Sequence, residues 1–155
     1  MEKFKSIFIV LSVLITTKTY SRQKFDFELG SNLQVISDKA FRRSKENKFE
    51  AIGNVIISYK DNTIYGEKAS VALSEGNIKV LGNVRFIAPE ASFFGSGLFY
   101  NYKSQELELQ NARVLSDNYV VLGDKIQVKG RKEIYAENAE YSTCKDCPES
   151  WSILG

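Results

Sequence analysis

Apolar and polar residues alternate along most of the chain. Between residues 49 and 59, Phe, Ala, Gly, Val, Ile and Tyr occupy every second position, and residues 78–88 repeat the arrangement. A period of two is typical of β-strands that bury one face. Turn-forming residues separate the runs, and Pro occurs only at positions 89 and 148. No segment after residue 21 has a convincing helical period, so the pattern predicts an all-β protein.

Two short motifs recur in alternation along the chain. The first reads Ala-Ile-Gly-Asn-Val and then Val-Leu-Gly-Asn-Val, at residues 51–55 and 80–84, with a fainter copy at 109–112. The second begins with a small residue, often followed by an acidic residue and Lys, at residues 37–40, 66–69, 95–98, 123–126 and 136–139. Marker residues of the successive motifs, at 37, 53, 66, 82, 95, 110, 123 and 136, are 13 to 16 residues apart. This step accommodates a strand of about nine residues and a turn of about four. Each motif is therefore expected to lie within one strand.

Glycines stand in the middle of the expected strands, at positions 53, 66, 82, 95 and 123. Each weakens its strand through backbone entropy, so a bend or a close approach of another backbone is expected there. The prediction is an antiparallel β-jelly roll or half-open rolled sheet, with layers bent at the glycines. Such a sheet leaves edge strands, expected around 33–41 and 133–141, that can pair with another copy or a relative.

The alternation also assigns an apolar inner face. On periodicity alone this face reads as an ordinary core. The residues assigned to it are Phe49, Val55, Ile57, Val71, Leu73, Ile78, Val80, Val84, Phe86, Leu107, Leu109, Leu122, Ile126 and Val128.

Composition narrows the possible functions. The 155 residues are 43% hydrophobic and 26% charged, which fits one ordinary domain. His is absent, which removes His-based acid–base and nucleophilic catalysis and imidazole metal sites. No enzyme activity, metal or cofactor is therefore expected.

The first 21 residues differ from the rest. Lys3 and Lys5 precede an uncharged run at 6–17, and small residues at 19 and 21 suit cleavage before Arg22. The alternative is an uncleaved anchor, but a spanning helix needs about 20 apolar residues. Cleavage would remove the net +2 charge of the chain, so the basicity belongs to an export signal and no nucleic-acid partner is expected.

The repeated Gly-Asn-Val motifs, the interleaved motifs and the export segment together resemble a known family. It is the OstA-like domain of the lipopolysaccharide transport proteins, the LptA/LptC/LptD group. The closing segment, Ala-Glu-Tyr-Ser-Thr-Cys at 139–144 followed by Pro148 and Trp151, resembles the junction between the periplasmic domain and the outer-membrane barrel of LptD-type members. The resemblance implies a signal peptide at 1–21, an N-terminal segment at 22–32, a jelly roll at 33–143 and a Cys/Trp junction at 144–155.

The resemblance also implies a function. It predicts a periplasmic module, associated with the outer membrane, whose apolar groove holds lipid A acyl chains of lipopolysaccharide during transport. Its implied partners are lipopolysaccharide, other OstA-like domains paired edge to edge, and outer-membrane assembly proteins where a barrel is present. The barrel is absent from this sequence, which therefore corresponds to a truncated product or to a stand-alone module. The alternatives without lipid transport are a structural envelope scaffold of the same fold that assembles edge to edge, and a carbohydrate-binding module.

Three smaller features remain. Lys39, Lys68, Lys125 and Lys129 either attract lipid phosphates at the rim or belong to a solvated outer face, and for each one alone the outer face is the better interpretation. Aromatic residues at 93, 94, 99, 100 and 102 suit core or lipid contact better than sugar stacking, because their sequence neighbours are mostly Gly and Ser.

Cys144 and Cys147 form the third feature. Redox catalysis is disfavoured because no helix start lowers a thiol pKa, and zinc is disfavoured because only two ligands are present. A structural disulfide is the preferred interpretation in an exported protein. The resemblance implies that Cys144 links to a barrel cysteine, whereas Cys147 has no clear counterpart; without a barrel, the two pair through a short loop.

Overall fold

A computed structural model describes residues 24–29, 32–130, 133–143 and 153–154 of the protein. The described part is built of β-strands and one short 3₁₀ turn, Ser44–Glu46, which confirms the all-β prediction. The strands are β1 Phe25–Glu28, β2 Leu33–Ser37, β3 Lys39–Arg43, β4 Lys48–Tyr59, β5 Asn62–Ala72, β6 Asn77–Ile87, β7 Ala91–Asn101, β8 Glu106–Ser116, β9 Val120–Lys129, β10 Glu133–Glu137, β11 Glu140–Ser142 and β12 Ile153–Leu154.

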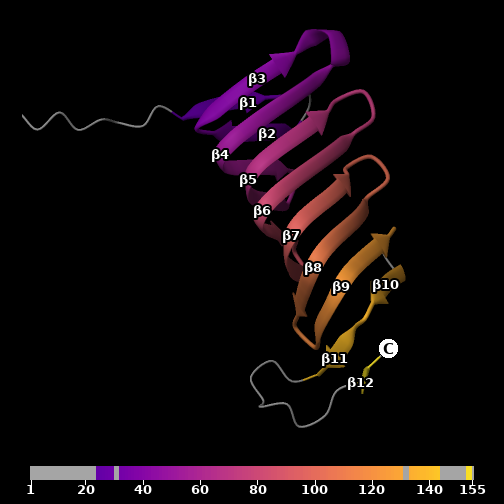
Figure 1. The fold of residues 1–155 in the computed structure, drawn as a ribbon. Coiled ribbons are helices and arrows are strands. Elements are labelled where there is room, and N and C mark those ends of the chain that lie inside the picture. Colours follow the sequence, from indigo (N-terminus) through magenta and orange to yellow (C-terminus); the bar gives the residue numbers. More distant parts are fainter. Residues whose placement is uncertain (1–23, 30–31, 131–132, 144–152, 155) are drawn as a thin grey trace, which may run out of the picture.

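The strands form one antiparallel sheet of 12 strands within the described residues. From β4 to β9, each strand pairs with the next one in the chain, so the sheet is a continuous meander. Figure 1 shows these strands side by side in chain order, from indigo to orange. The strand order is linear and does not return to its start, so the described sheet is open.

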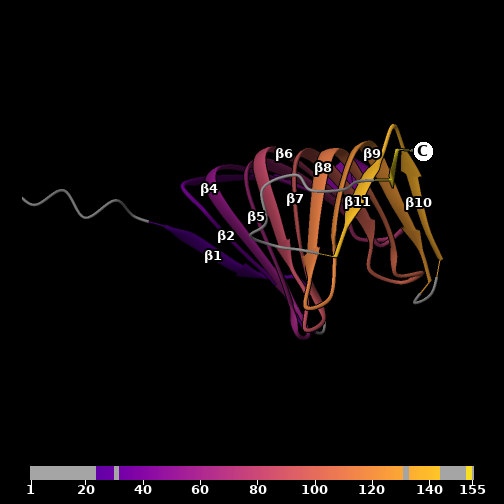
Figure 2. The ribbon, with the colours of Figure 1, turned by 90° about the horizontal axis from the view of Figure 1, so that it is seen from below.

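Each long strand crosses the sheet from one half to the other. The Lys48–Ile52 half of β4 pairs with β3, whereas the half near Tyr59 pairs with β2. Likewise, one half of β9 pairs with β10 and the other with β11. We call the half bounded by β3 and β10 the first arm, and the half bounded by β1, β2, β11 and β12 the second arm. Figure 2 shows how the sheet curls so that the two arms face each other.

The two arms meet at a bend in each strand, which we call the corner. In β4 and β6 the bend is a bulge, where the register shifts between Ile52 and Val55 and between Leu81 and Val84. The Gly-Asn pair of each first motif occupies the bulge, and Gly82 and Asn83 have φ values of +79° and +44°. Gly and Asn adopt this left-handed conformation more readily than other residues. The expectation of a bend is therefore confirmed at Gly53 and Gly82.

A row of side-chain hydrogen bonds runs along the corner. In the described residues four asparagines with positive φ each donate a hydrogen bond from Nδ2 to a side chain of the second motif, 14 to 16 residues earlier. The pairs are Asn54 to Asp38 at 2.8 Å, Asn83 to Glu67 at 2.7 Å, Asn111 to Ser96 at 2.8 Å and Asn138 to Asp124 at 2.8 Å. In the first three pairs the two repeated motifs are thus the two halves of one corner contact. In the fourth pair the donor Asn138 belongs to the last copy of the second motif, at 136–139, and takes the place of the first motif.

The hydrophobic core lies between the arms. Both arms turn their apolar faces inward, and the core runs along the stack from Leu33 to Ile126. Its side chains are at most 9% exposed. Burial of this apolar surface is the main contribution to the stability of the fold.

Candidate functional site

The interior between the arms contains almost all of the residues that the alternation assigns to the inner face. Eleven are buried, and Leu73 and Val128 are partly buried and pack against the core. The buried ones are Phe49, Val55, Ile57, Val71, Ile78, Val80, Val84, Phe86, Leu107, Leu109 and Ile126. Arg85 and Glu108 point to the other side of the sheet and are more exposed than their strand neighbours.

The assignment of Leu122 to the inner face is wrong. Leu122 is 40% exposed, whereas its neighbour Val121 is 8% exposed and belongs to the core. The prediction assumed one uniform alternation through β9. The strand lacks a Gly-Asn bulge, which would add one residue at the corner. The buried positions therefore change from odd to even numbers there, and the next buried residue after Val121 is Ile126. A one-residue change of this kind moves a side chain to the opposite face.

The same change of phase explains why the sequence analysis missed several interior residues of β5, β7 and β8. In β5 and β7 the buried positions are separated by five residues across the corner, as Ile64 and Ala69, and as Phe93 and Leu98. Val114 and Ala112 of β8 were also missed. For β5, β7 and β9 the signal was present in the sequence, because the second motif in each of these strands starts at a glycine two residues after a buried position, at Gly66, Gly95 and Gly123.

Side chains close the interior on the side opposite the corner, which we call the mouth. Tyr59 at the end of the second arm lies 5.0 Å from Tyr102 at the end of the first, measured between ring centroids. Phe86 and Tyr100 make a similar contact across the interior at 5.2 Å. Tyr102 also donates a hydrogen bond from its hydroxyl to the Leu73 carbonyl at 3.2 Å. Every strand pairing in the described sheet lies within one arm, so no strand ladder holds the mouth shut there.

Two buried or partly buried tyrosines near the mouth, Tyr100 and Tyr102, have raised pKa values. Burial raises the pKa of Tyr100 above its ordinary value, and the nearby Tyr59 raises it further. The pKa of Tyr102 is raised by the same two causes. The interior is therefore lined by uncharged groups at neutral pH.

The aromatic cluster of β7 divides between the two faces. Phe93 and Tyr100 are buried and contact Phe86, in agreement with the core interpretation. Phe99 is 41% exposed on the outer face of the first arm. Phe94 is half-buried on the outer side of the second arm.

The four lysines considered for the rim lie on the outer side of the first arm. Lys39 of β3 and Lys68 of β5 are exposed, and each pairs with Ile52 of β4 in the strand register. Lys129 places its Nζ 5.3 Å from the ring centroid of Tyr135. Lys125 Nζ lies 3.2 Å from Glu108 Oε2. The pKa of Glu108 is lowered by a hydrogen bond from Gln127 and by this lysine, although partial burial opposes the shift. These placements fit the solvated outer face.

The edges of the sheet differ in part from those expected. β1 pairs with β2 from Phe25 opposite Ser37 to Glu28 opposite Gln34, so β2 is not an edge and the expectation for residues 33–37 is wrong. This added strand is held by Phe27, whose ring lies 5.1 Å from that of Phe49. Among the described strands, β3 pairs with β4 alone and β10 with β9 alone. The available edges of the first arm are therefore β3 and β10.

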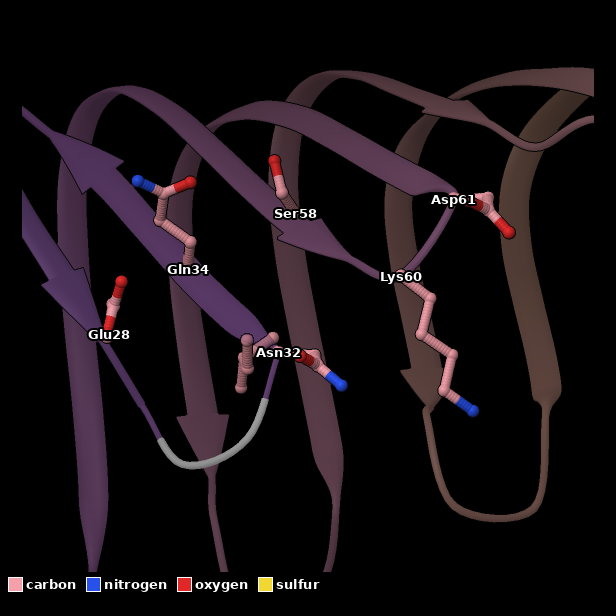
Figure 3. A pocket seen from close by; sticks show the side chains of 7 residues that line it. Glu28, Asn32, Gln34, Ser58, Lys60 and Asp61 are labelled. Carbon is pink, nitrogen blue, oxygen red and sulfur yellow. The ribbon is translucent and has the colours of Figure 1, made fainter.

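A polar hollow of about 670 Å³ lies near the end of the second arm. Figure 3 shows its side chains, which come from the ends of β1, β2 and β4 and from the turn after β4. Lys60 of that turn places its Nζ 5.2 Å from the ring centroid of Tyr59. This hollow is lined mainly by polar residues and adjoins the mouth. It offers a polar surface beside the apolar interior.

Several sequence predictions lie outside the described residues. They include the export segment at 1–21 and the cysteines Cys144 and Cys147 with their disulfide. In the part of the chain that is described, no helix is long and apolar enough to cross a membrane. Within the same residues, no group of three or more His, Cys, Asp or Glu side chains is placed to hold a metal ion.

These features define a class of protein: an all-β module with an open, bent antiparallel sheet around an apolar interior. The fold is that of LptH from Pseudomonas aeruginosa, described as the LptA homologous periplasmic component of the conserved lipopolysaccharide transport device. The two structures superpose with a TM-score of 0.62 at 16% sequence identity, covering 79% of this chain and 93% of LptH. The expected jelly-roll fold is thereby confirmed.

Sequence comparison leads to the same group of proteins. The chain is 28% identical over 111 residues to the LPS-assembly protein LptD of Nitrosomonas europaea and 24% identical over 111 residues to that of Nitrosomonas eutropha. Each match covers 70% of this chain but 15% of the relative, so the chain spans a small part of the length of these curated proteins. No family model matches the chain. The resemblance to the OstA-like domain of lipopolysaccharide transport proteins is confirmed by these relatives and by the fold.

Proposed function

We propose that this protein is a module of lipopolysaccharide transport that holds lipid A acyl chains between its two arms. The observation that carries the proposal is the apolar interior whose mouth is closed by side chains, at Tyr59 with Tyr102 and at Phe86 with Tyr100. The similarity to LptD and to the LptA homologue LptH supports the same function.

In the described residues, opening the mouth breaks aromatic contacts between the arms, at Tyr59 with Tyr102 and at Phe86 with Tyr100. If the arms separate at Tyr59 and Tyr102, the strand ladders within each arm remain intact, because the described ladders do not cross the mouth. An acyl chain that enters then replaces the lost contacts and removes its own apolar surface from water, at about 25 cal/mol per Å². Contacts of this kind have no preferred direction, so the chain can slide along the stack of strands.

The residues proposed to contact the acyl chain are those of the predicted inner face without Leu122. Five of them lie near the cross-arm contacts or deep in the stack: Val84, Phe86, Ile57, Val80 and Leu109. The interior residues Ile64, Leu98 and Tyr100 join this set because they face the same space. No cofactor and no bond-making chemistry form part of the proposal.

Edge pairing with related modules is the second part of the proposal. The two edges of the first arm have opposite charge: β3 carries Lys39, Arg42 and Arg43, whereas β10 carries Glu133 and Glu137. Strand direction alternates from β3 to β10 along this arm. β3 of a following module therefore has the direction needed to pair antiparallel with β10.

The proposed setting is the periplasm, next to the outer membrane. Residues 1–21 are proposed to be a cleaved signal peptide, residues 33–143 the jelly roll and residues 144–155 the junction segment. β1 falls within the N-terminal segment 22–32 and extends the second arm by one strand. Outer-membrane assembly proteins are proposed as partners where a barrel follows.

Site-specific photo-crosslinking to lipopolysaccharide tests the acyl-chain site. Probes replace Val84, Phe86 or Leu109 on the inner face, and Arg85 or Glu108 on the outer face as controls from the same strands. Circular dichroism confirms that each variant is folded. Adducts confined to the inner positions are expected. Absence of adducts at folded inner-face variants, or equal adducts at Arg85 and Glu108, would contradict the proposal and favour a scaffold with a filled core.

A further inference from the structure

A hollow of about 980 Å³ lies on the outer side of the second arm, next to the corner. Tyr65 of β5, Arg85 of β6 and Phe94 of β7 lie opposite one another in the register of neighbouring strands and line the hollow. In each strand they alternate with buried residues of the interior, so their side chains lie on the opposite side of the sheet. The hollow also borders on Val55 and Val84, which are buried in the core. The side chains of Tyr65, Arg85 and Phe94 nevertheless lie on the side of the sheet opposite the proposed acyl-chain site.

The aromatic and cationic groups of the hollow are held in place. The Arg85 guanidinium lies 4.7 Å from the centroid of the Tyr65 ring. This cation–π contact limits the rotamers of Arg85, so its planar set of N–H donors is already ordered before a ligand arrives. Phe94 lies on the other side of Arg85 in the register and is half-buried, which leaves part of its ring accessible.

Polar planar side chains surround these rings. Asn54 and Asn83 of the corner line the hollow together with Glu67. Asn83 donates a hydrogen bond to Glu67 at 2.7 Å, which fixes both side chains. An Asn side chain has two N–H donors and an acceptor oxygen, and a carboxylate has about four acceptor positions, so both keep hydrogen-bonding capacity beyond this bond.

The charges around the hollow are balanced. Lys24 and Arg85 are cationic, and Asp38 and Glu67 are anionic. A ligand with a net negative charge would meet the two carboxylates, and a cation would meet the two basic groups. Balanced charges with adjoining donors and acceptors suit hydroxyl groups, since each hydroxyl both donates and accepts.

We infer that this hollow binds a neutral saccharide. The apolar C–H face of a sugar ring packs on Phe94, as apolar groups pack on aromatic rings generally. Its hydroxyl groups accept hydrogen bonds from Arg85 and Asn83 and donate to Glu67. A small number of polar groups around an aromatic platform is the usual composition of a specific ligand site. These polar partners come from neighbouring strands, which is why the sequence around Phe94 does not reveal them.

Titration of the isotope-labelled protein followed by NMR tests the site. The probes are maltopentaose and cellopentaose, both neutral, and a sulfated pentasaccharide of the same length. Saturable shifts are expected at Tyr65, Arg85 and Phe94 with a neutral probe and weaker ones with the sulfated probe. Phe94→Ala and Arg85→Gln are each expected to weaken binding about tenfold. Phe99→Ala, in the same strand but on the first arm, is the control and leaves binding unchanged.

Two outcomes would overturn the inference. The first is the absence of saturable shifts with both neutral probes, or stronger binding of the sulfated one. The second is a set of shifts at Phe94 that depends on protein concentration without any sugar, which would identify the hollow as a contact between copies. Thermal melting of the variants verifies that each is folded. The lipid crosslinks at Val84, Phe86 and Leu109, with Glu108 as their control, are independent of this outcome, because none of the sugar variants enters the interior. Arg85 lines the hollow, so an adduct at Arg85 alone reports on the hollow and not on the acyl-chain site.

Discussion

Asn83 donates a hydrogen bond from Nδ2 to Glu67 Oε1 at 2.7 Å, and this contact joins the two repeated motifs of the chain at the corner of the sheet. Asn83 has a φ of +44° and follows Gly82, whose φ is +79°. The bulge that these two residues form turns β6 from the first arm into the second. Three further asparagines of the described chain make equivalent contacts.

Replacement of Asn83 should separate the two contributions of this residue. Asn83→Ala loses the hydrogen bond to Glu67. It also places Ala in the left-handed conformation, which Ala tolerates less well than Asn does. The free energy of unfolding is therefore expected to fall by about 2 kcal/mol. Asn83→Gly loses the bond but keeps the backbone conformation, and about half that loss is expected. Urea denaturation measures both. Equal losses for the two variants would show that the left-handed conformation contributes little.

Gly95 and Gly97 offer a matched pair in β7. A β-carbon at Gly95 would lie 2.6 Å from the backbone oxygen of Gln110 and 2.8 Å from Leu109, whereas at Gly97 the nearest atom is the side-chain oxygen of Gln110 at 3.3 Å. Gly95→Ala is therefore expected to destabilise the protein by about 1–3 kcal/mol through overpacking. Gly97→Ala should lower the free energy of unfolding clearly less than Gly95→Ala does. Comparable losses in a urea titration would mean that the corner can relax around the added methyl group.

The buried tyrosine Tyr100 predicts a loss of stability at alkaline pH. Its pKa is raised above 10.0 in the folded protein, chiefly by burial. Because the pKa is raised on folding, the stabilising contribution of neutral Tyr100 is fully present below the pKa of the unfolded state. This contribution is lost as the pH rises through the pKa of the folded state. Tyr100→Phe removes this ionisable group and should lose less stability between pH 9 and about 11.5 than the parent protein. Thermal melts across this range compare the two, and parallel curves would contradict the prediction.

The lowered pKa of Glu108 predicts a loss of stability at acid pH. Gln127 donates a hydrogen bond to Glu108 at 2.7 Å and Lys125 lies 3.2 Å away, and both lower its pKa. Because the pKa is lowered on folding, the stabilising contribution of ionised Glu108 is present above the pKa of the unfolded state. This contribution is lost as the pH falls through the pKa of the folded state. Glu108→Gln is expected to destabilise the protein by about 0.5–1 kcal/mol at pH 7. Thermal melts at stepped pH should show the stability difference between this variant and the parent protein shrinking toward about pH 3. A difference that stays constant with pH would rule out ionisation of Glu108 as its cause.

The interior could be predicted in large part because alternation is a local property. The positions of Val55, Val80 and Val84 follow directly from the period of two, since the Gly-Asn bulge in β4 and β6 contributes an extra residue that preserves the numbering. β9 has no such bulge, and there the same rule placed Leu122 on the wrong face. The phase of a strand depends on how its backbone passes the corner, which the apolar pattern does not encode.

The outer surface was less predictable. The sequence neighbours of Phe94 are small residues, and sugar binding was disfavoured for that reason. Tyr65 and Arg85 come from two other strands, and the register of the sheet brings them beside Phe94. In the same way, residues 25–28 alternate as Phe-Asp-Phe-Glu, but alternation does not say which strand they pair with, and only the structure places β1 beside β2.

The sequence by itself determined the class of fold, the spacing of the long strands, places where these strands bend and most of the buried face. These features follow from short-range rules: alternation, turn residues, and the conformations that Gly and Asn tolerate. Only the tertiary structure decided which strands form the edges, how the mouth between Tyr59 and Tyr102 is closed, and which side chains meet on the outer face. These features depend on register between strands that lie far apart in the chain, and register is set by the packing of the whole sheet.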